Sequence, residues 1–78
     1  MTKLKASERL DRTAMQLVRD QHICIRREVV KATDKATLAR LVKRGYVVRD
    51  ANSEYSDALQ LTWDGIDYLG VLEESWHD

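Results

Sequence analysis

Thiol, imidazole and carboxylate groups are the side chains of this sequence that can do covalent or metal chemistry. Cys24 is the single cysteine, and His22 lies two residues before it. A zinc site needs a second pair of such ligands, which the sequence lacks, because the other histidine, His77, is far away along the chain. Cys24 also has no histidine and acidic residue at the spacing of a thiol enzyme. We therefore expect no catalytic residue, no metal ligand and no enzymatic activity.

Cofactor-binding patterns are also missing from the sequence. The glycines at positions 45, 65 and 70 are scattered and form no phosphate-binding loop. The carboxylates are plentiful, but no two of them are placed in a pattern that suggests an acid–base pair. We expect no bound cofactor.

The charged residues are divided between the two halves of the chain, although the net charge is zero. All 13 Lys and Arg residues lie within residues 1–49 together with five acidic residues, so this stretch has a net charge of +8. Residues 50–78 hold the other eight acidic residues and no Lys or Arg, a net charge of −8. Such asymmetry points to a nucleic-acid partner or to an acidic tail.

Length and composition predict one soluble domain over residues 1–78. Of the residues, 44% are hydrophobic and 33% are charged, which is typical of globular proteins. No apolar run approaches the roughly 20 residues that a membrane span needs. The segment 1–5 lacks the apolar stretch of a secretory signal, and one cysteine forms no internal disulfide. We expect a cytoplasmic protein that does not contact a membrane.

The spacing of apolar residues predicts the elements that position these charges. Four helices are predicted, over residues 7–20, 26–32, 35–44 and 63–75. Residues 46–49 and 58–62 are strand-like and enclose a turn-rich segment, which predicts a hairpin. Residues 22–25 are either a brief strand or a linker. Helices are predicted to begin at the capping residues Ser7, Thr33 or Asp34, and Thr62. Gly45 is predicted to end the helix over 35–44.

The inward faces of two helices follow from the same spacing. In the helix over 35–44, Leu38, Leu41 and Val42 are predicted to face the core, which leaves its Lys, Thr and Arg side chains pointing away. In the last helix, an apolar stripe that includes Ile66 closes the core. Three further apolar or aromatic side chains do not fit that stripe and predict the interface of a homodimer: Tyr68, Val71 and Trp76.

Two segments resemble winged helix-turn-helix proteins. Residues 38–47, Leu-Ala-Arg-Leu-Val-Lys-Arg-Gly-Tyr-Val, look like the end of a recognition helix and the strand after it. Residues 61–69 begin with Leu-Thr-Trp-Asp-Gly, which resembles the motif after the wing in short bacterial and phage proteins of this class. The resemblance covers about residues 25–72. It implies a small α+β fold with a three-helix core, a two-stranded β-hairpin wing and a C-terminal helix.

This resemblance and the basic half together predict a double-stranded DNA-binding protein, a phage or bacterial transcriptional regulator. The helix over 35–44 is expected to lie in the major groove, with Lys35 and Thr37 near bases or phosphates and Arg40 on guanine O6 and N7. The full set of predicted DNA contacts is Lys31, Thr33, Lys35, Thr37, Arg40, Lys43, Arg44 and Arg49.

The predicted wing is unusual because it is acidic. Its tip carries Asn52, Ser53 and Tyr55 as candidate contacts, but three acidic residues surround them, and a phosphate would repel these carboxylates. An alternative therefore stays open, in which the chain is a protein-binding winged helix. In that case it is a phage-encoded inhibitor or adaptor of a host complex and acts through its acidic C-terminal half.

Overall fold

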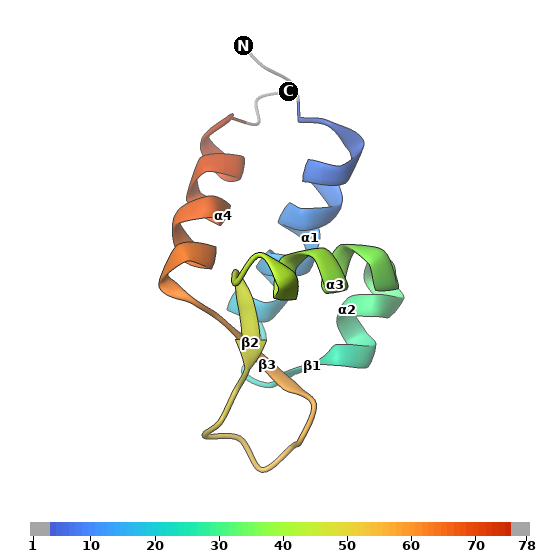
Figure 1. Ribbon diagram of the computed structural model, residues 1–78, viewed down its shortest axis with the longest axis vertical. Coiled ribbons are helices and arrows are strands. Elements are labelled where there is room, and N and C mark those ends of the chain that lie inside the picture. The colour runs from blue at the N-terminus through green and yellow to red at the C-terminus, as the bar shows by residue number, and fades with distance from the viewer. Residues whose placement is uncertain (1–3, 76–78) are drawn as a thin grey trace.

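The computed structural model describes residues 4–75, which form a small α+β fold of four helices and a three-stranded antiparallel sheet (Figure 1). The elements follow in the order α1 (Ala6–Asp20), β1 (Cys24–Ile25), α2 (Arg26–Ala32), α3 (Lys35–Lys43), β2 (Val47–Arg49), β3 (Ala58–Leu61) and α4 (Trp63–Ser75). The predicted α+β class and the four predicted helices are confirmed. Among the described residues, no helix is both long enough and apolar enough to cross a membrane.

The sheet has β3 as its central strand, in the order β1-β3-β2. The predicted hairpin is formed by β2 and β3, with Val47 opposite Leu61. Of the two alternatives for residues 22–25, the strand is correct, because Cys24 pairs with Leu59. The backbone N–H of Arg26 also donates to the carbonyl of Asp57, at 2.9 Å. The hairpin is therefore fastened to the chain segment that leads into α2.

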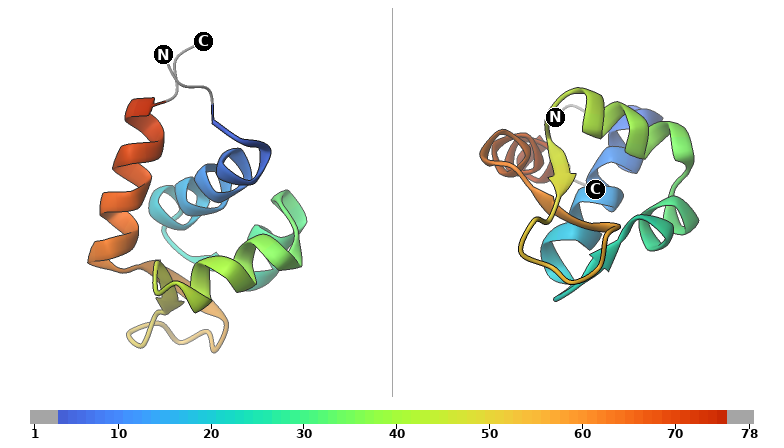
Figure 2. Two further views of the ribbon diagram at one scale, coloured as in Figure 1. Left: turned by 45° about the horizontal axis from the view of Figure 1, so that its top comes forward. Right: turned by 60° about the horizontal axis from the view of Figure 1, so that its bottom comes forward.

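Helix α1 lies at the centre of the helical layer, with α4 on one side and α2 and α3 on the other (Figure 2). Its inward face places Ala14, Met15 and Val18 at helical spacing in the core. The buried apolar residues come from the segment before α1, from all four helices and from the strands: Leu4, Ala14, Met15, Val18, Cys24, Val29, Leu38, Leu41, Val47, Ala58, Leu69 and Leu72.

The rotation of α3 about its axis differs from the prediction. Leu38 and Leu41 are buried as expected, but Val42 is 42% exposed and Thr37 is only 1% exposed. Both Thr37 and Val42 lie one helical turn from one of the two leucines, so helical spacing alone permits either as the third inward residue. The prediction of an outward Thr37 and an inward Val42 is therefore wrong. Ile66 of α4, also predicted to face the core, is 47% exposed.

The ends of the helices mostly follow the predicted capping residues. Asp34 caps α3, since its carboxylate accepts a hydrogen bond from the backbone N–H of Thr37 at 2.6 Å. Gly45 has a φ of 79° after the end of α3, the left-handed conformation that favours glycine there. The predicted cap at Ser7 is wrong, because α1 begins at Ala6 and the Glu8 carboxylate accepts from the Lys5 backbone N–H at 2.9 Å.

The segment Leu-Thr-Trp-Asp-Gly fastens the start of α4 to the turn after α3. The Thr62 hydroxyl donates to the Gly45 carbonyl at 2.6 Å and accepts from the Gly65 N–H at 3.0 Å, which confirms Thr62 as a helix cap. The Thr62 N–H donates to the Tyr46 carbonyl at 3.0 Å. A Cβ on Gly65 would lie 2.1 Å from that same carbonyl oxygen, so only glycine fits this close approach.

Candidate nucleic-acid interface

The outward face of α3 has cationic ends and an alkyl centre. Lys35 and Lys43 are exposed at the two ends of the helix, and the exposed Ala36 and Ala39 lie between them at helical spacing. Val42 is exposed beside this row. The short alanine side chains allow a partner to approach the helix backbone closely between the two ammonium groups.

Further cations surround α3 on neighbouring elements. Exposed basic side chains lie on α2, on α3 and its C-cap, and at the end of β2: Arg26, Arg27, Lys31, Lys35, Lys43, Arg44 and Arg49. Within residues 4–75, none of these side chains forms a salt bridge. The nearby carboxylate of Asp34 is engaged as the α3 cap, and its hydrogen bonds with Thr37 hold its pKa below the usual value. These cations are therefore free to neutralise an external polyanion.

Three of the predicted DNA contacts are buried or engaged in contacts within the fold and are not free on this surface. Thr37 is buried in the core, as described above. Thr33 is half-buried, and its hydroxyl donates to the Val29 carbonyl at 2.7 Å, so it is engaged within the end of α2. Arg40 turns toward α1 and forms a salt bridge with Asp11, so the prediction that it points away from the core is wrong. The side chains of Lys31, Lys35, Lys43, Arg44 and Arg49 are exposed as predicted.

Asp11 is a buried carboxylate that joins three helices, and the sequence analysis missed it. It is 2% exposed and accepts a hydrogen bond from Nη2 of Arg40 on α3 and another, at 3.0 Å, from the Tyr68 hydroxyl on α4. The Tyr68 ring stacks on Tyr46, with ring centroids 4.6 Å apart. Burial and the bond to Asp11 raise the pKa of Tyr68 to about 12, so the hydroxyl stays a donor. The position of Asp11 three residues before Ala14 on the inward stripe of α1 was the available signal.

This network explains the rotation of α3. A carboxylate buried as deeply as that of Asp11 needs a cationic partner or several hydrogen bonds to offset its lost hydration. Arg40 supplies the cation only when α3 turns its Arg40 side toward α1. That rotation carries Thr37 into the core and Val42 out to the surface.

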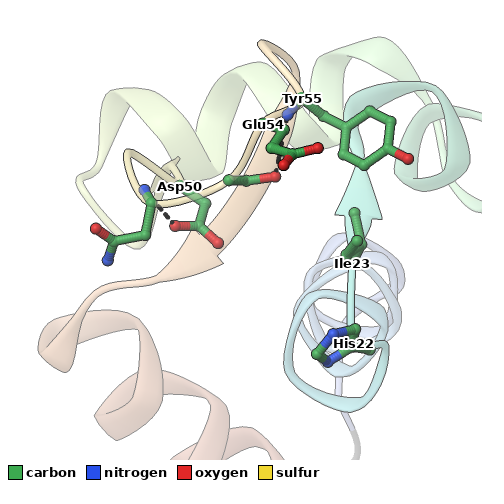
Figure 3. Close-up of a pocket in the computed structure, with 7 residues that line it drawn as sticks. His22, Ile23, Asp50, Glu54 and Tyr55 are labelled. Atoms are coloured by element: carbon green, nitrogen blue, oxygen red, sulfur yellow. Dashed lines mark hydrogen bonds between the residues drawn. The ribbon is translucent and has the colours of Figure 1, made fainter.

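The loop between β2 and β3, residues 50–57, is a poor partner for a polyanion. Asp50 accepts from the Asn52 N–H at 3.0 Å, and the Ser53 hydroxyl accepts from the Tyr55 N–H at 3.2 Å. Opposite this loop lie His22 and Ile23, and the two segments enclose an open hollow of about 290 Å³ (Figure 3). Asp50 and Glu54 in its lining make the hollow acidic.

The described residues offer neither a grouped set of metal ligands nor an exposed thiol. Among residues 4–75, no three His, Cys, Asp or Glu side chains are grouped so that they could hold a metal ion. Cys24 is 1% exposed, and burial, with a smaller effect of Glu28, raises the pKa of its thiol. The reactive thiolate is therefore disfavoured at neutral pH.

The predicted dimer interface is only partly visible on α4. Tyr68 is half-buried and held by Asp11 and Tyr46, so it is not a free surface residue. Val71 is 56% exposed, and Trp76 lies outside the described residues. Dimer formation stays a prediction.

Two charge sets, the Lys and Arg residues of positions 1–49 and the acidic residues of positions 50–78, occupy different elements. The acidic residues of the C-terminal half lie on α4 and the hairpin loop, and exposed basic residues gather on α2 and α3, which pack on the other side of α1 from α4 (Figure 2). Two exposed carboxylates, Glu28 of α2 and Asp34 before α3, lie among these basic residues. Among the described residues, a single salt bridge joins the two sets, from Arg19 of α1 to Glu73 of α4 at 2.7 Å. Hydrogen bonds from Arg19 and Gln16 lower the pKa of Glu73.

Comparison with known proteins adds no relative to this description. No family model, no curated protein and no solved structure matches the chain.

Proposed function

We propose that this chain is a winged helix-turn-helix domain that binds double-stranded DNA, as a transcriptional regulator of a phage or a bacterium. In this proposal α2 and α3 form the helix-turn-helix, β2 and β3 form the wing, and α3 enters the major groove. One observation carries the proposal: the outward face of α3 holds Lys35 and Lys43 around an alkyl centre, and neither lysine forms a salt bridge within residues 4–75.

The chemistry of that face suits base edges and phosphates. Lys35 lies in the first turn of α3, the part of a recognition helix that meets base edges, and an ammonium group donates to guanine O6 or N7. The methyl groups of Ala36 and Ala39 suit apolar contact with the C5-methyl group of thymine. Lys43 and the cations of α2 suit phosphates on both sides of the groove.

The acidic hairpin loop limits the size of this interface. Asp50, Glu54 and Asp57 would meet repulsion from phosphates, so we expect the loop to stand clear of the duplex. About three to five phosphates would then be neutralised per copy, which gives a slope of log K against log salt between about −3 and −4.5. Affinity would fall by roughly 50- to 500-fold between 50 and 200 mM salt.

The test is a fluorescence anisotropy titration of a labelled random-sequence duplex at those two salt concentrations. The double variant Lys35→Ala/Lys43→Ala should bind more weakly, and its salt slope should be shallower by about 1 for each of the two lysines that neutralises a phosphate. The matched control removes two exposed charges of the same sign from the start of α1, Lys5→Ala/Arg9→Ala. Absence of duplex binding by the wild type at low salt, or equal losses in the two double variants, would refute the proposal.

The partner copy predicted from the sequence would place two α3 helices one helical turn of DNA apart. Sedimentation at tens of micromolar protein checks this: a monomer speaks against a stable dimer in the absence of DNA.

A further inference from the structure

An apolar groove crosses from the hairpin to the start of α4, and none of its lining residues belongs to α3. It has a volume of about 440 Å³ and is called the Trp63 groove here. Its lining consists of Val48, Gln60, Leu61, Thr62, Trp63 and Ile66. Trp63 is 84% exposed, Ile66 is 47% exposed and Val48 is 37% exposed, so three large apolar side chains face solvent together.

Exposure of this kind is unusual for a small soluble domain. A tryptophan buries some 150 to 250 Å² when it is covered, and this side chain is left almost entirely in water. Nothing in the local fold requires an aromatic ring there, because Thr62 and Gly65 make the contacts that fasten α4. Exposed aromatic residues beside a groove mark interaction surfaces, and tryptophan is enriched among the residues that dominate binding energy.

The charges beside the groove disfavour two possible binding partners, DNA and a second copy of the chain. No cation is present among its six lining residues, and Asp64 and Asp67 are exposed on the same helix, one and four positions after Trp63. DNA is disfavoured there, since its phosphates would meet these carboxylates. Two copies paired groove to groove are also disfavoured, because Asp64 and Asp67 of each would lie near those of the other and no Lys or Arg follows position 49.

The charge at the other end of this apolar surface determines the orientation in which a partner segment would bind. Val48 also lines a second hollow, of about 250 Å³, whose walls include Val42 and three charged residues, Arg26, Arg49 and Asp57, with a net charge of +1. The apolar surface therefore continues from Trp63 toward α3, but its charge changes from acidic at α4 to basic beside β2. Positive charge in an occupant is favoured only at the α4 end.

We propose that the Trp63 groove binds a cationic segment of a partner protein, with an apolar side chain of that segment seated against Trp63 and Ile66 and its Lys or Arg residues over Asp64 and Asp67. This inference goes beyond DNA binding and does not depend on it. The segment combines two features that the groove needs, an apolar anchor to cover the tryptophan and positive charge to match the carboxylates.

The test uses the full chain and two model peptides of identical length. One is a 14-residue amphipathic leucine–lysine peptide, and the other has glutamate in place of lysine. Isothermal titration calorimetry at about 150 mM salt, close to physiological ionic strength, should show binding of the lysine peptide and no binding of the glutamate peptide. Backbone amide shifts in ¹⁵N spectra should concentrate at Val48, Gln60 and Ile66.

Variants locate the contact. Trp63→Ala should weaken the lysine peptide at least about tenfold, as expected for a tryptophan that carries much of a contact. Val71→Ala is the matched control, since Val71 is an exposed apolar residue of α4 that does not line the groove. Asp64→Asn/Asp67→Asn should weaken binding severalfold and reduce its salt dependence. Trp63 is mostly exposed, so circular dichroism should show an unchanged fold for its variant.

Several outcomes would overturn the proposal. They are equal binding of the two peptides, no binding of the lysine peptide, or equal effects of the Trp63 and Val71 variants. Sedimentation that shows a dimer dissociated by Trp63→Ala would also overturn it, because the groove would then belong to a second copy. None of these results bears on duplex binding through α3, so the two proposals fail separately.

Discussion

Asp11 and Arg40 form a buried ion pair, and we predict that substituting one partner lowers the stability of the fold more than substituting the other. Arg40→Ala removes the cation and leaves the Asp11 carboxylate, which is 2% exposed, with the Tyr68 hydroxyl as its remaining side-chain partner among residues 4–75. Asp11→Asn breaks the same ion pair but leaves no buried charge. Its amide can accept from Arg40 and donate to the Tyr68 oxygen, and the Arg40 side chain is 29% exposed and reaches water.

The magnitudes follow from this asymmetry. Removing one partner of a buried ion pair costs about 3–5 kcal/mol, and partial exposure of Arg40 places its loss near the lower end, at about 3 kcal/mol. Asp11→Asn exchanges a charged hydrogen bond for a neutral one and should cost about 1 kcal/mol. In a domain of this size, these losses correspond to falls in Tm of roughly 12–24 °C and 4–8 °C.

Urea denaturation followed by circular dichroism measures both free energies of unfolding. The double variant Arg40→Ala/Asp11→Asn provides an internal check, because it removes the orphaned charge and should be more stable than Arg40→Ala alone. A result in which Asp11→Asn costs as much as Arg40→Ala, or in which the double variant is the least stable of the three, would refute the reasoning.

Three further predictions concern single sites. Gly65→Ala should cost at least about 3 kcal/mol or prevent folding, because its Cβ collides with the Tyr46 carbonyl. Gly70→Ala meets no atom within 4 Å and should stabilise α4 by up to about 1 kcal/mol. Urea denaturation measures the free energy of unfolding of both variants, and equal effects would contradict the prediction. Asp34→Ala should lower the free energy of unfolding through loss of the α3 cap. The pKa of Asp34 is lowered in the folded state, so the stabilisation by this cap is present above the unfolded pKa of about 4 and disappears as the pH falls below it. If the free energies of unfolding of the wild type and Asp34→Ala differ by the same amount from pH 7 to 2, this prediction is wrong. Cys24 should react slowly with iodoacetamide in the native state and rapidly in urea, because its thiol is buried and its pKa is raised. Mass spectrometry of the alkylated protein measures both rates, and equal rates would contradict the prediction.

Local patterns were enough to predict most of the elements from the sequence. Apolar spacing and capping chemistry act within a few residues, so the four helices, the hairpin and the roles of Asp34, Gly45 and Thr62 follow from neighbours along the chain. The third strand was left open because residues 24–25 form a strand only through their partner β3, which is more than 30 positions away.

The rotation of α3 was not predictable from its own residues. Thr37 and Val42 fit the helical stripe equally well by position, and hydrophobicity favours Val42, which is the wrong choice. The deciding contact is between Arg40 and Asp11, which lie 29 positions apart on different helices. This rotation changes the candidate interface, because it replaces the predicted Thr37 and Arg40 by Ala36 and Ala39 on the outward face.

The contacts of Thr62 also bear on how the fold opens. The Thr62 side chain and N–H hold Gly45 and Tyr46, and Gly65 packs on that same Tyr46 carbonyl, so three segments meet within a few ångströms. The first turn of α4 therefore has no route to unwind independently while the turn after α3 stays in place. In hydrogen exchange, the amides of Tyr46, Thr62 and Gly65 should become accessible through one shared opening, with one common free energy, as parts of a single cooperative unit.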